Sequence, residues 1–327
     1  MAGIMKNRDT NVLFQNGSVW LQADFHLHTK ADKEFAYPGA ENDFVNDYVN
    51  KLVAQNIRLG VITNHNKFDK SEFVALKKKA YDKGVGLFPG LEFSLKEGIP
   101  ILIVFDDAWY KGQTDYINQF LDAAFDGIEL QETVKKLDAI GHHYFIMLAH
   151  VDARESSERV LAIEGIGEGQ ITYSKIGDFS FEALQYALSD HKNRLQLKDK
   201  PQINNSYIKS ISFQGGLLNE QQIFFSPELN NLIGIRGSGK SSILEILRYA
   251  LNIPFGSQTV DKEYKDDLIK HVLKSGGKVV LEIVNRQGET YKVERIYGQK
   301  EDIYKEGILQ HGITLDAILQ QPIYFGQ

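Results

Sequence analysis

Residues 19–28, VWLQADFHLH, contain the pattern on which the predicted fold depends. Apolar and polar side chains alternate along this run, which predicts a β-strand. The strand ends in His26 and His28, and side chains two residues apart share one face of a strand. Because neutral imidazole is a common transition-metal ligand, the pair indicates either a metal site or two ordinary histidines beside a turn.

The composition of the whole chain limits the possible classes of protein. Its 327 residues are enough for about two domains. The chain contains no cysteine, which excludes disulfides, thiolate zinc sites and a cysteine nucleophile, and we therefore expect a cytoplasmic protein. No apolar run reaches the ~18–20 residues of a membrane helix, so no membrane partner is expected. The net charge of −6 gives no overall attraction to nucleic acid.

Strand and helix patterns alternate up to about residue 176. Residues 41–56 predict a helix with one apolar face, formed by Phe44, Val45, Tyr48, Val49, Leu52 and Val53. Residues 71–84 predict another helix, with Ser71 as its N-cap. This alternation favours an α/β fold with a mostly parallel sheet or small barrel of about seven strands. After the first strand, the predicted strands cover residues 59–65, 85–95, 99–106, 144–152, 159–165 and 171–176.

Several of these strands contain metal-ligating side chains at or near their ends. His65 ends the second, Glu92 lies in the third, and His150 and Asp152 end the fifth. In parallel βα folds, the loops after the strands converge on one mouth, where the chemistry takes place. Imidazole and carboxylate ligands together suit Zn²⁺, Mn²⁺ or Fe²⁺. We therefore expect a divalent transition metal, with the ligands converging in one cluster.

Four motifs resemble those of the PHP (polymerase and histidinol phosphatase) superfamily. They are DFHLHT at 24–29, GVITNHN at 60–66, FPGLEFS at 88–94 and IMLAH at 146–150, within residues 19–190. The resemblance implies a metal-dependent phosphoesterase domain on a distorted seven-stranded βα barrel, with two or three metals at its mouth. It implies that the ligands and catalytic residues are His26, His28, His65, Glu92 and His150.

The chain departs from the PHP pattern at three places. Asn64 stands where the family usually has Asp, and Pro100 and Ile101 stand where it usually has His. Near the end of the domain, adjacent Asp190 and His191 replace an Asp-x-His pair. We therefore expect a site that holds fewer metals or is catalytically weak.

Residues 234–242, GIRGSGKSS, match the phosphate-binding loop G-x-x-x-x-G-K-[ST]. An apolar strand is expected before the loop and a helix at 241–251 after it. Glycines let backbone amides curl around phosphate, while Lys240 would reach the β- and γ-phosphates and Ser241 would bind Mg²⁺. We therefore predict ATP with Mg²⁺, bound by Gly234, Arg236, Gly237, Ser238, Gly239, Lys240, Ser241 and Ser242.

The residues around this loop, FSPELNNLIGIRGSGKSSILEILRYAL at 225–251, resemble the N-terminal lobe of an SMC-, RecN- or Rad50-like ABC ATPase. The resemblance implies strands at 277–285 and 289–297, and it makes Gln327 a contact of Mg²⁺ and the γ-phosphate. Neither a signature motif nor a Walker B strand is found in the sequence. Either the chain is a fragment, or a C-lobe or second ATPase head is expected from another chain, as in a homo-oligomer. The chain alone is expected to hydrolyse ATP poorly.

Residues 19–190 and 207–327, with an expected linker at 191–206, together resemble TrlF-type proteins, in which a PHP domain is fused to an SMC-like ATPase. Some of these proteins are linked to phage defence. The resemblance implies a metal-dependent phosphodiesterase or nuclease, gated by the ATPase half, acting on nucleic acid in phage defence or DNA repair. Two alternatives stay open: a phosphomonoesterase of small metabolites, and a non-catalytic barrel that supports an ATP-driven nucleic-acid clamp.

Overall fold

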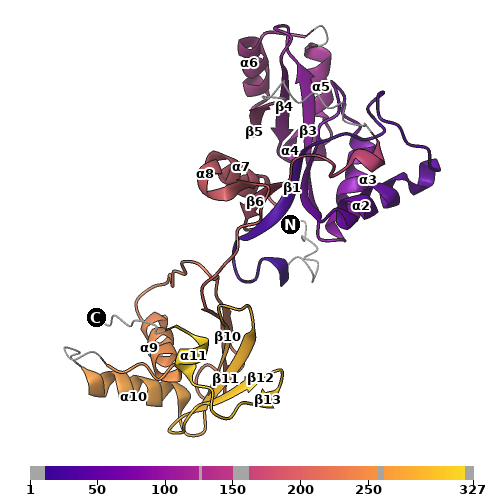
Figure 1. Cartoon of the computed structure of the whole chain (residues 1–327). Helices are drawn as coiled ribbons and strands as arrows, with labels where there is room; N and C mark the ends of the chain where they lie inside the picture. The colour runs from indigo at the N-terminus through magenta and orange to yellow at the C-terminus, as the bar shows by residue number, and fades with distance from the viewer. Residues whose placement is uncertain (1–11, 125–126, 150–161, 256–260, 321–327) are drawn as a thin grey trace. The chain divides into compact units, whose positions relative to one another are not determined.

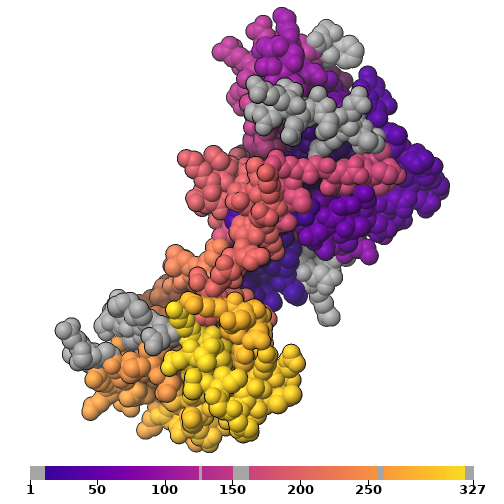
Figure 2. Space-filling model, in the orientation of Figure 1, coloured from indigo at the N-terminus to yellow at the C-terminus, as the bar shows by residue number. Residues whose placement is uncertain are grey.

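The computed structural model describes residues 12–124, 127–149, 162–255 and 261–320 (Figure 1). The chain forms two compact units, Met1–Phe14 with Ser18–Pro201, and Gln15–Gly17 with Gln202–Gln327. Figure 2 shows the first unit from indigo to pink and the second from orange to yellow. Among the described residues, no helix is both long and apolar enough to cross a membrane.

A curled seven-stranded sheet forms a half-barrel in the first unit, with the order β5-β4-β3-β2-β1-β6-β7. Only the pairs β1–β2 and β2–β3 are parallel, and the other four pairs are antiparallel. The expectation of a mostly parallel sheet is therefore wrong, in part because a short turn returns β4 directly along β3. The strands are β1 (Val19–Leu27), β2 (Ile57–Ile62), β3 (Gly86–Ser94), β4 (Pro100–Phe105), β5 (Tyr144–Leu148), β6 (Thr172–Ile176) and β7 (Leu195–Leu197).

Helices pack on both faces of this sheet. Helix α2 (Phe44–Ala54) buries Phe44, Tyr48, Val49 and Leu52, as its sequence pattern predicts. Helices α3 (Lys70–Tyr81), α4 (Ala108–Lys111), α5 (Tyr116–Ala123) and α6 (Leu130–Ile140) contribute to the same core, and this side is called the α2/α3 face below. Helix α7 (Phe181–Ser189) packs on the other side, the α7 face. The N-cap of α3 is Asp69, not Ser71, because the Asp69 carboxylate accepts a hydrogen bond from the amide of Glu72.

A β-bulge near the end of β1 changes the face on which its side chains pack. Leu21 and Ala23 pack in the core of the α7 face, but Leu27 packs in the core of the α2/α3 face. Strict alternation would place all three on one side, and the register with β2 shifts between Asp24 and Leu27. Phe25 still packs against the α7-face core, so the change of face lies between Phe25 and Leu27, around His26.

Two sequence boundaries of the first unit need correction. The segment 191–206, expected to be a linker, contains α8 (His191–Arg194) and β7, which pairs with β6. The first unit therefore extends to Pro201. In the expected strand at 159–165, the short helix η2 occupies Ile163–Gly165, and residues 159–161 lie outside the described part.

The second unit contains an antiparallel six-stranded sheet with the order β13-β12-β11-β10-β8-β9. Helix α9 begins at Lys240, so its first residues are the last three of the glycine-rich loop at 234–242. The strands are β8 (Tyr207–Gln214), β9 (Gln222–Phe224), β10 (Lys278–Val284), β11 (Thr290–Ile296), β12 (Asp302–Lys305) and β13 (Ile308–Leu309); the helices are α9 (Lys240–Ala250), α10 (Lys262–Leu273) and α11 (Leu315–Ile318).

The strand expected directly before the glycine-rich loop does not form. Residues 225–239 contain no strand, and the side chains of Ile233 and Ile235 are 93% and 82% exposed. A strand needs a neighbour with which to share its backbone hydrogen bonds. Phe225 still donates its amide hydrogen to the carbonyl of Lys209 in β8, but none of the described strands pairs with residues 226–239.

Candidate metal centre

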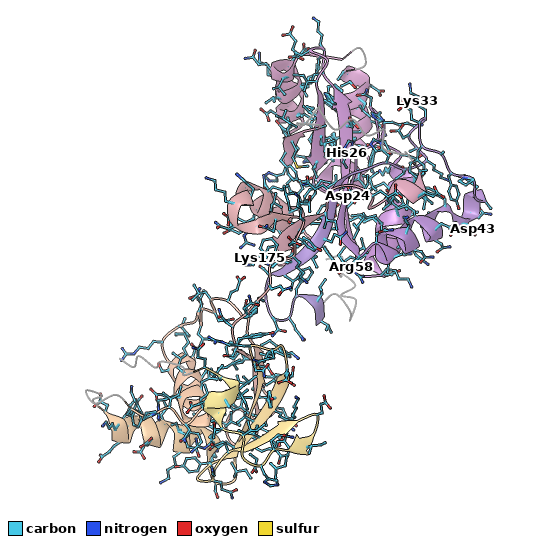
Figure 3. The ribbon with its side chains drawn as sticks, in the orientation of Figure 1. Asp24, His26, Lys33, Asp43, Arg58 and Lys175 are labelled. Carbon is cyan, nitrogen blue, oxygen red and sulfur yellow. The ribbon has the colours of Figure 1, made fainter. Side chains whose placement is uncertain are left out.

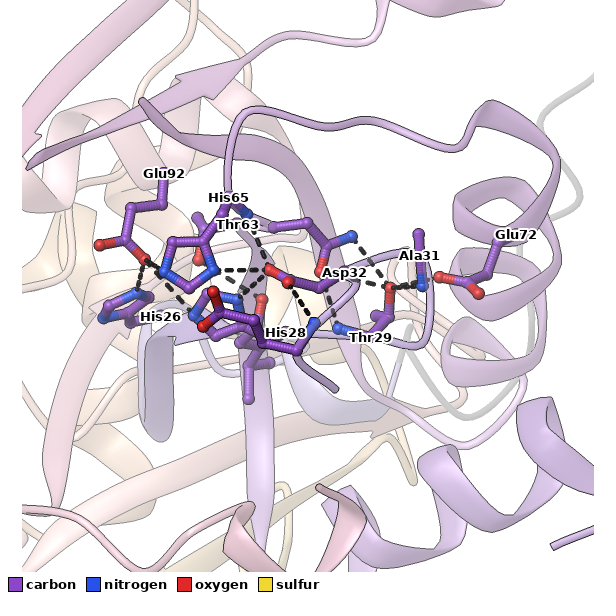
Figure 4. Close-up of polar contacts among 12 residues, drawn as sticks. His26, His28, Thr29, Ala31, Asp32, Thr63, His65, Glu72 and Glu92 are labelled. Atoms are coloured by element: carbon purple, nitrogen blue, oxygen red, sulfur yellow. Dashed lines mark hydrogen bonds and ion pairs between the residues drawn. The ribbon is translucent and has the colours of Figure 1, made fainter. Parts of the chain in front are cut away.

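Four of the five predicted ligands meet where β1, β2 and β3 end (Figure 4). His26 belongs to β1, and His28 follows that strand directly; Figure 3 shows His26 beside Asp24. His65 lies three residues beyond the last residue of β2, and Glu92 lies within β3. The fifth residue, His150, is outside the described residues, as are Asp152 and Gln327.

One carboxylate oxygen stands at the centre of this cluster. Glu92 Oε2 lies 2.7 Å from His26 Nε2, 3.5 Å from His28 Nε2 and 3.1 Å from His65 Nε2. Glu92 is almost fully buried. Ligand atoms of His26, His28 and Glu92 all lie within 4.8 Å of one another. Three imidazole nitrogens and a carboxylate converging on one point form a donor set that suits a divalent transition metal.

Asp32 is a member of the cluster that the sequence reasoning missed. Its Oδ2 atom lies 3.0 Å from His28 Nδ1 and 2.7 Å from His65 Nδ1, and it accepts a hydrogen bond from the backbone amide of His65 at 2.8 Å. His28, Asp32 and His65 form a second group with metal-ligand spacing. Asp32 lies in the loop after β1 rather than at the end of a strand. A prediction based on residues at strand ends therefore does not include it. The sequence feature that could have identified Asp32 is its position as an acidic residue four positions after His28.

The protonation states of the buried groups suit metal binding. Burial, followed by the neighbouring His26, lowers the pKa of His28 to about 4. Burial by itself raises the pKa of Asp32, but hydrogen bonds from the amides of His65 and Glu34 and from the two imidazoles hold it at about 2. Burial also raises the pKa of Glu92, yet the hydrogen bond and charge of His26 leave it below its usual value. At neutral pH the cluster therefore has two carboxylates and a neutral His28, the forms in which these groups bind metals.

Asn64, one of the departures from the PHP pattern, ties the two ligand loops together. Its Oδ1 accepts a hydrogen bond from the amide of Thr29 at 2.8 Å, and its Nδ2 donates to Thr29 Oγ1 at 3.0 Å. The Thr29 hydroxyl also donates to Glu72 in the first turn of α3. Tyr48 donates to the carbonyl of His28 at 2.9 Å. These buried contacts fix the peptide bond between His28 and Thr29 and link it to Asn64, next to His65.

The other predicted or discussed positions lie elsewhere. Asp24 Oδ1 accepts a hydrogen bond from the backbone amide of His26 at 3.1 Å, within the bulge. Asp190 contacts Arg194 at 3.4 Å where α7 meets α8, and neither it nor His191 belongs to a described metal group. Ile101 is buried in the apolar core of the α2/α3 face.

The glycine-rich loop has the backbone conformation that its sequence suggests. Gly237 and Gly239 have φ angles of 81° and 89°, a region that favours glycine. Lys240 Nζ donates to the carbonyl oxygens of Gly234 at 2.6 Å and Ile235 at 2.8 Å, so its ammonium group lies over the loop. Arg236, Ser238, Ser241 and Ser242 complete the set of predicted ATP contacts within the described residues.

A hollow of about 1000 Å³ lies away from the metal cluster. It is lined by the start of β3, the last turns of α3 and the beginning of α7, including Lys77, Phe88 and Phe179. Glu92 is near the other end of β3, and none of the cluster residues lines the hollow. The hollow and the candidate metal ligands are therefore near different ends of β3.

Comparison with known proteins gives little further information. No family model matches the chain, and no curated protein is similar to it. An amidohydrolase from Chromobacterium violaceum, solved with bound sulfate and no metal, is 17% identical, with a TM-score of 0.25 over 36% of this chain. The chain spans only 39% of that protein. At such a TM-score the likeness supports no conclusion about fold or activity.

Proposed function

We propose that the first unit is a metal-dependent phosphoesterase, with phosphodiesters of nucleic acid as its substrates, and that the second unit binds ATP with Mg²⁺. The observation that supports the metal site is the approach of three imidazole Nε2 atoms to one oxygen of Glu92. The phosphodiester substrate rests on the resemblance of four sequence motifs to the PHP superfamily. Fold-level analogy of this kind suggests a reaction class but not a particular substrate.

The residues present fit a divalent cation. His26, His28, His65 and Glu92 would hold it, because the Nε2 atom of each ring lies within 3.5 Å of one Glu92 oxygen. Such an ion supplies charge neutralisation at a phosphoryl group and makes water a better nucleophile at neutral pH. Asn64 and Tyr48 hold the ligand loops in place before any ion arrives. Burial of Glu92 and His28 limits access of bulk water to the ligands.

ATP binding by the second unit is supported by the loop from Gly234 to Ser242. Lys240 is held over the loop by two backbone carbonyls, and α9 starts at this lysine, so its N-terminus faces the same loop. We propose that a second ATPase head or C-lobe, supplied by another copy or another chain, completes the nucleotide site. Nucleic acid would then be the shared partner of both units.

Elemental analysis of the purified chain, combined with a cleavage screen, tests the proposal. Single-stranded DNA, duplex DNA, RNA and p-nitrophenyl phosphate would each be incubated with Mn²⁺, with and without EDTA. We expect bound transition metal and EDTA-sensitive cleavage of at least one nucleic acid. Hydrolysis of p-nitrophenyl phosphate alone would favour the small-molecule phosphomonoesterase. Metal without any hydrolysis, together with ATP-dependent nucleic-acid binding, would favour the clamp.

A further inference from the structure

The imidazoles of His28 and His65 stand between two carboxylates. Their ring centroids are 4.6 Å apart, with an interplanar angle of 28°. Asp32 Oδ2 lies against Nδ1 of both rings, and Glu92 Oε2 lies on the side of both Nε2 atoms. Figure 4 shows Asp32 and Glu92 at opposite edges of the His65 ring. Each ring therefore has one nitrogen facing each acid.

Asp32 has the surroundings of an ionised hydrogen-bond acceptor. It is almost fully buried, Oδ1 accepts the amide of Glu34 at 3.0 Å, and Oδ2 accepts the amide of His65 at 2.8 Å. An ionised carboxylate can only accept hydrogen bonds. The two Nδ1 atoms form hydrogen bonds with this acceptor at 3.0 Å and 2.7 Å, whereas the Nε2 atoms of His28 and His65 face Glu92 at the longer distances of 3.5 Å and 3.1 Å. These distances place the protons on Nδ1 and leave the lone pair of each neutral imidazole on Nε2.

We infer that Asp32 is a positioning residue that selects the Nε2-ligating tautomer of His28 and His65, so that these rings serve a single metal ion on the Glu92 side. His26 Nε2 lies 2.7 Å from the same Glu92 oxygen and would become a third Nε2 ligand once it releases the proton that it donates to that carboxylate. The group of His28, Asp32 and His65 then holds no second ion, because a neutral imidazole has only one lone pair. Asp32 acts through the imidazoles rather than by touching the metal.

The inference rests on the proposed metal site, but its first test needs no metal. Long-range ¹H–¹⁵N spectra of the metal-free, histidine-labelled protein would report which ring nitrogen carries the proton. We expect Nδ1–H for His28 and His65 in the wild type. In Asp32→Asn, whose side chain can also donate, we expect a mixture of tautomers. Asp43→Asn, at an exposed aspartate labelled in Figure 3, is the matched control and should leave the spectrum unchanged.

Metal titration supplies the second test. We expect Asp32→Asn to weaken Mn²⁺ and Zn²⁺ binding by about 10–100-fold, as is usual for residues that orient a ligand. At saturating metal, Asp32→Asn should bind as many ions per chain as the wild type. One ion fewer would make Asp32 a direct ligand and overturn the inference.

The two tests separate the possible failures. Nε2–H tautomers of His28 and His65 in the metal-free wild type would overturn the role of Asp32 and leave the proposed metal site standing. Nδ1–H tautomers together with no metal uptake by the wild type would overturn the proposed function and the single-ion site. Because the first measurement uses the unmodified chain, poor folding of Asp32→Asn would not prevent it.

Discussion

His65 and Glu92 are joined by their backbones as well as by their side chains. An isolated parallel bridge pairs them beyond the end of β2, with Glu92 N donating to Asn64 O at 3.1 Å and Asn66 N donating to Glu92 O at 2.9 Å. Their side chains meet at 3.1 Å between His65 Nε2 and Glu92 Oε2. The carboxylate at the centre of the cluster is therefore positioned by main-chain hydrogen bonds, not only by its rotamer.

Glu92→Gln is expected to weaken metal binding more than Asp32→Asn does. The amide keeps the shape of the side chain but removes the negative charge at which three Nε2 atoms converge. Isothermal titration with Mn²⁺ and Zn²⁺ should show a loss beyond the roughly 10–100-fold that is typical of residues that only orient a ligand. The exposed Glu182→Gln is the control. Unchanged affinity in Glu92→Gln would remove Glu92 from the site.

The double change His26→Ala with His28→Ala should release the ion and eliminate phosphodiesterase activity while the protein stays folded. It removes two nitrogen donors from the group formed with Glu92. Metal content and Mn²⁺-dependent cleavage would be measured together, and circular dichroism would check the fold. His191→Ala with His311→Ala removes two exposed histidines and should change neither quantity. Cleavage at the wild-type rate by the first variant would show that this cluster is not the nuclease.

Lys240→Ala should abolish ATP binding and leave the metal content of the first unit unchanged. The ammonium of Lys240 lies over the glycine-rich loop, whereas the metal cluster is built from residues of the other compact unit. Binding of a fluorescent ATP analogue and elemental analysis would be compared with Lys262→Ala, which alters an exposed lysine of α10. Equal loss of metal in Lys240→Ala would show that the two sites depend on each other.

Asp107 should make stability depend on pH in the acid range. Burial alone raises the pKa of its carboxyl, but Lys77, Lys111 and Tyr110 together hold it at about 2, below the ordinary 3.8. Lys77 Nζ lies 2.6 Å from Asp107 Oδ1. Because the folded-state pKa is depressed, this stabilisation is complete above about pH 4 and is lost as the pH falls towards 2.

Urea unfolding of the wild type and Asp107→Asn would measure this contribution. We expect the difference in unfolding free energy to be about 1 kcal/mol near pH 6, after solvent screening of this partly exposed group, and to shrink by pH 2. Asp107 and Asp82 both line the hollow of about 1000 Å³ described above, and Asp82 is exposed. Asp82→Asn is therefore the control and should show no such dependence on pH. A difference that stays constant from pH 6 to pH 2 would contradict the assignment.

Local patterns in the sequence were sufficient for several features. The strand at 19–28, the apolar face of α2, and helix α9 after a loop with glycines at positive φ all follow from residues close together in the chain. The convergence of His26, His28 and His65 on Glu92 also followed from the positions of these residues relative to their strands. Such features depend on periodicity and short-range sterics, which a sequence displays directly.

Other features were decided only by contacts between distant residues. The sheet is mostly antiparallel because β4 turns back along β3 and β6 pairs in reverse with β1, and neither pairing has a periodic signature. The bulge that separates the packing of Ala23 from that of Leu27 arises from the register with β2. Asp32 becomes part of the site because a loop folds it against His65, 33 residues away. Long-range hydrogen bonding and burial, rather than local sequence preference, therefore set the geometry of the candidate metal centre.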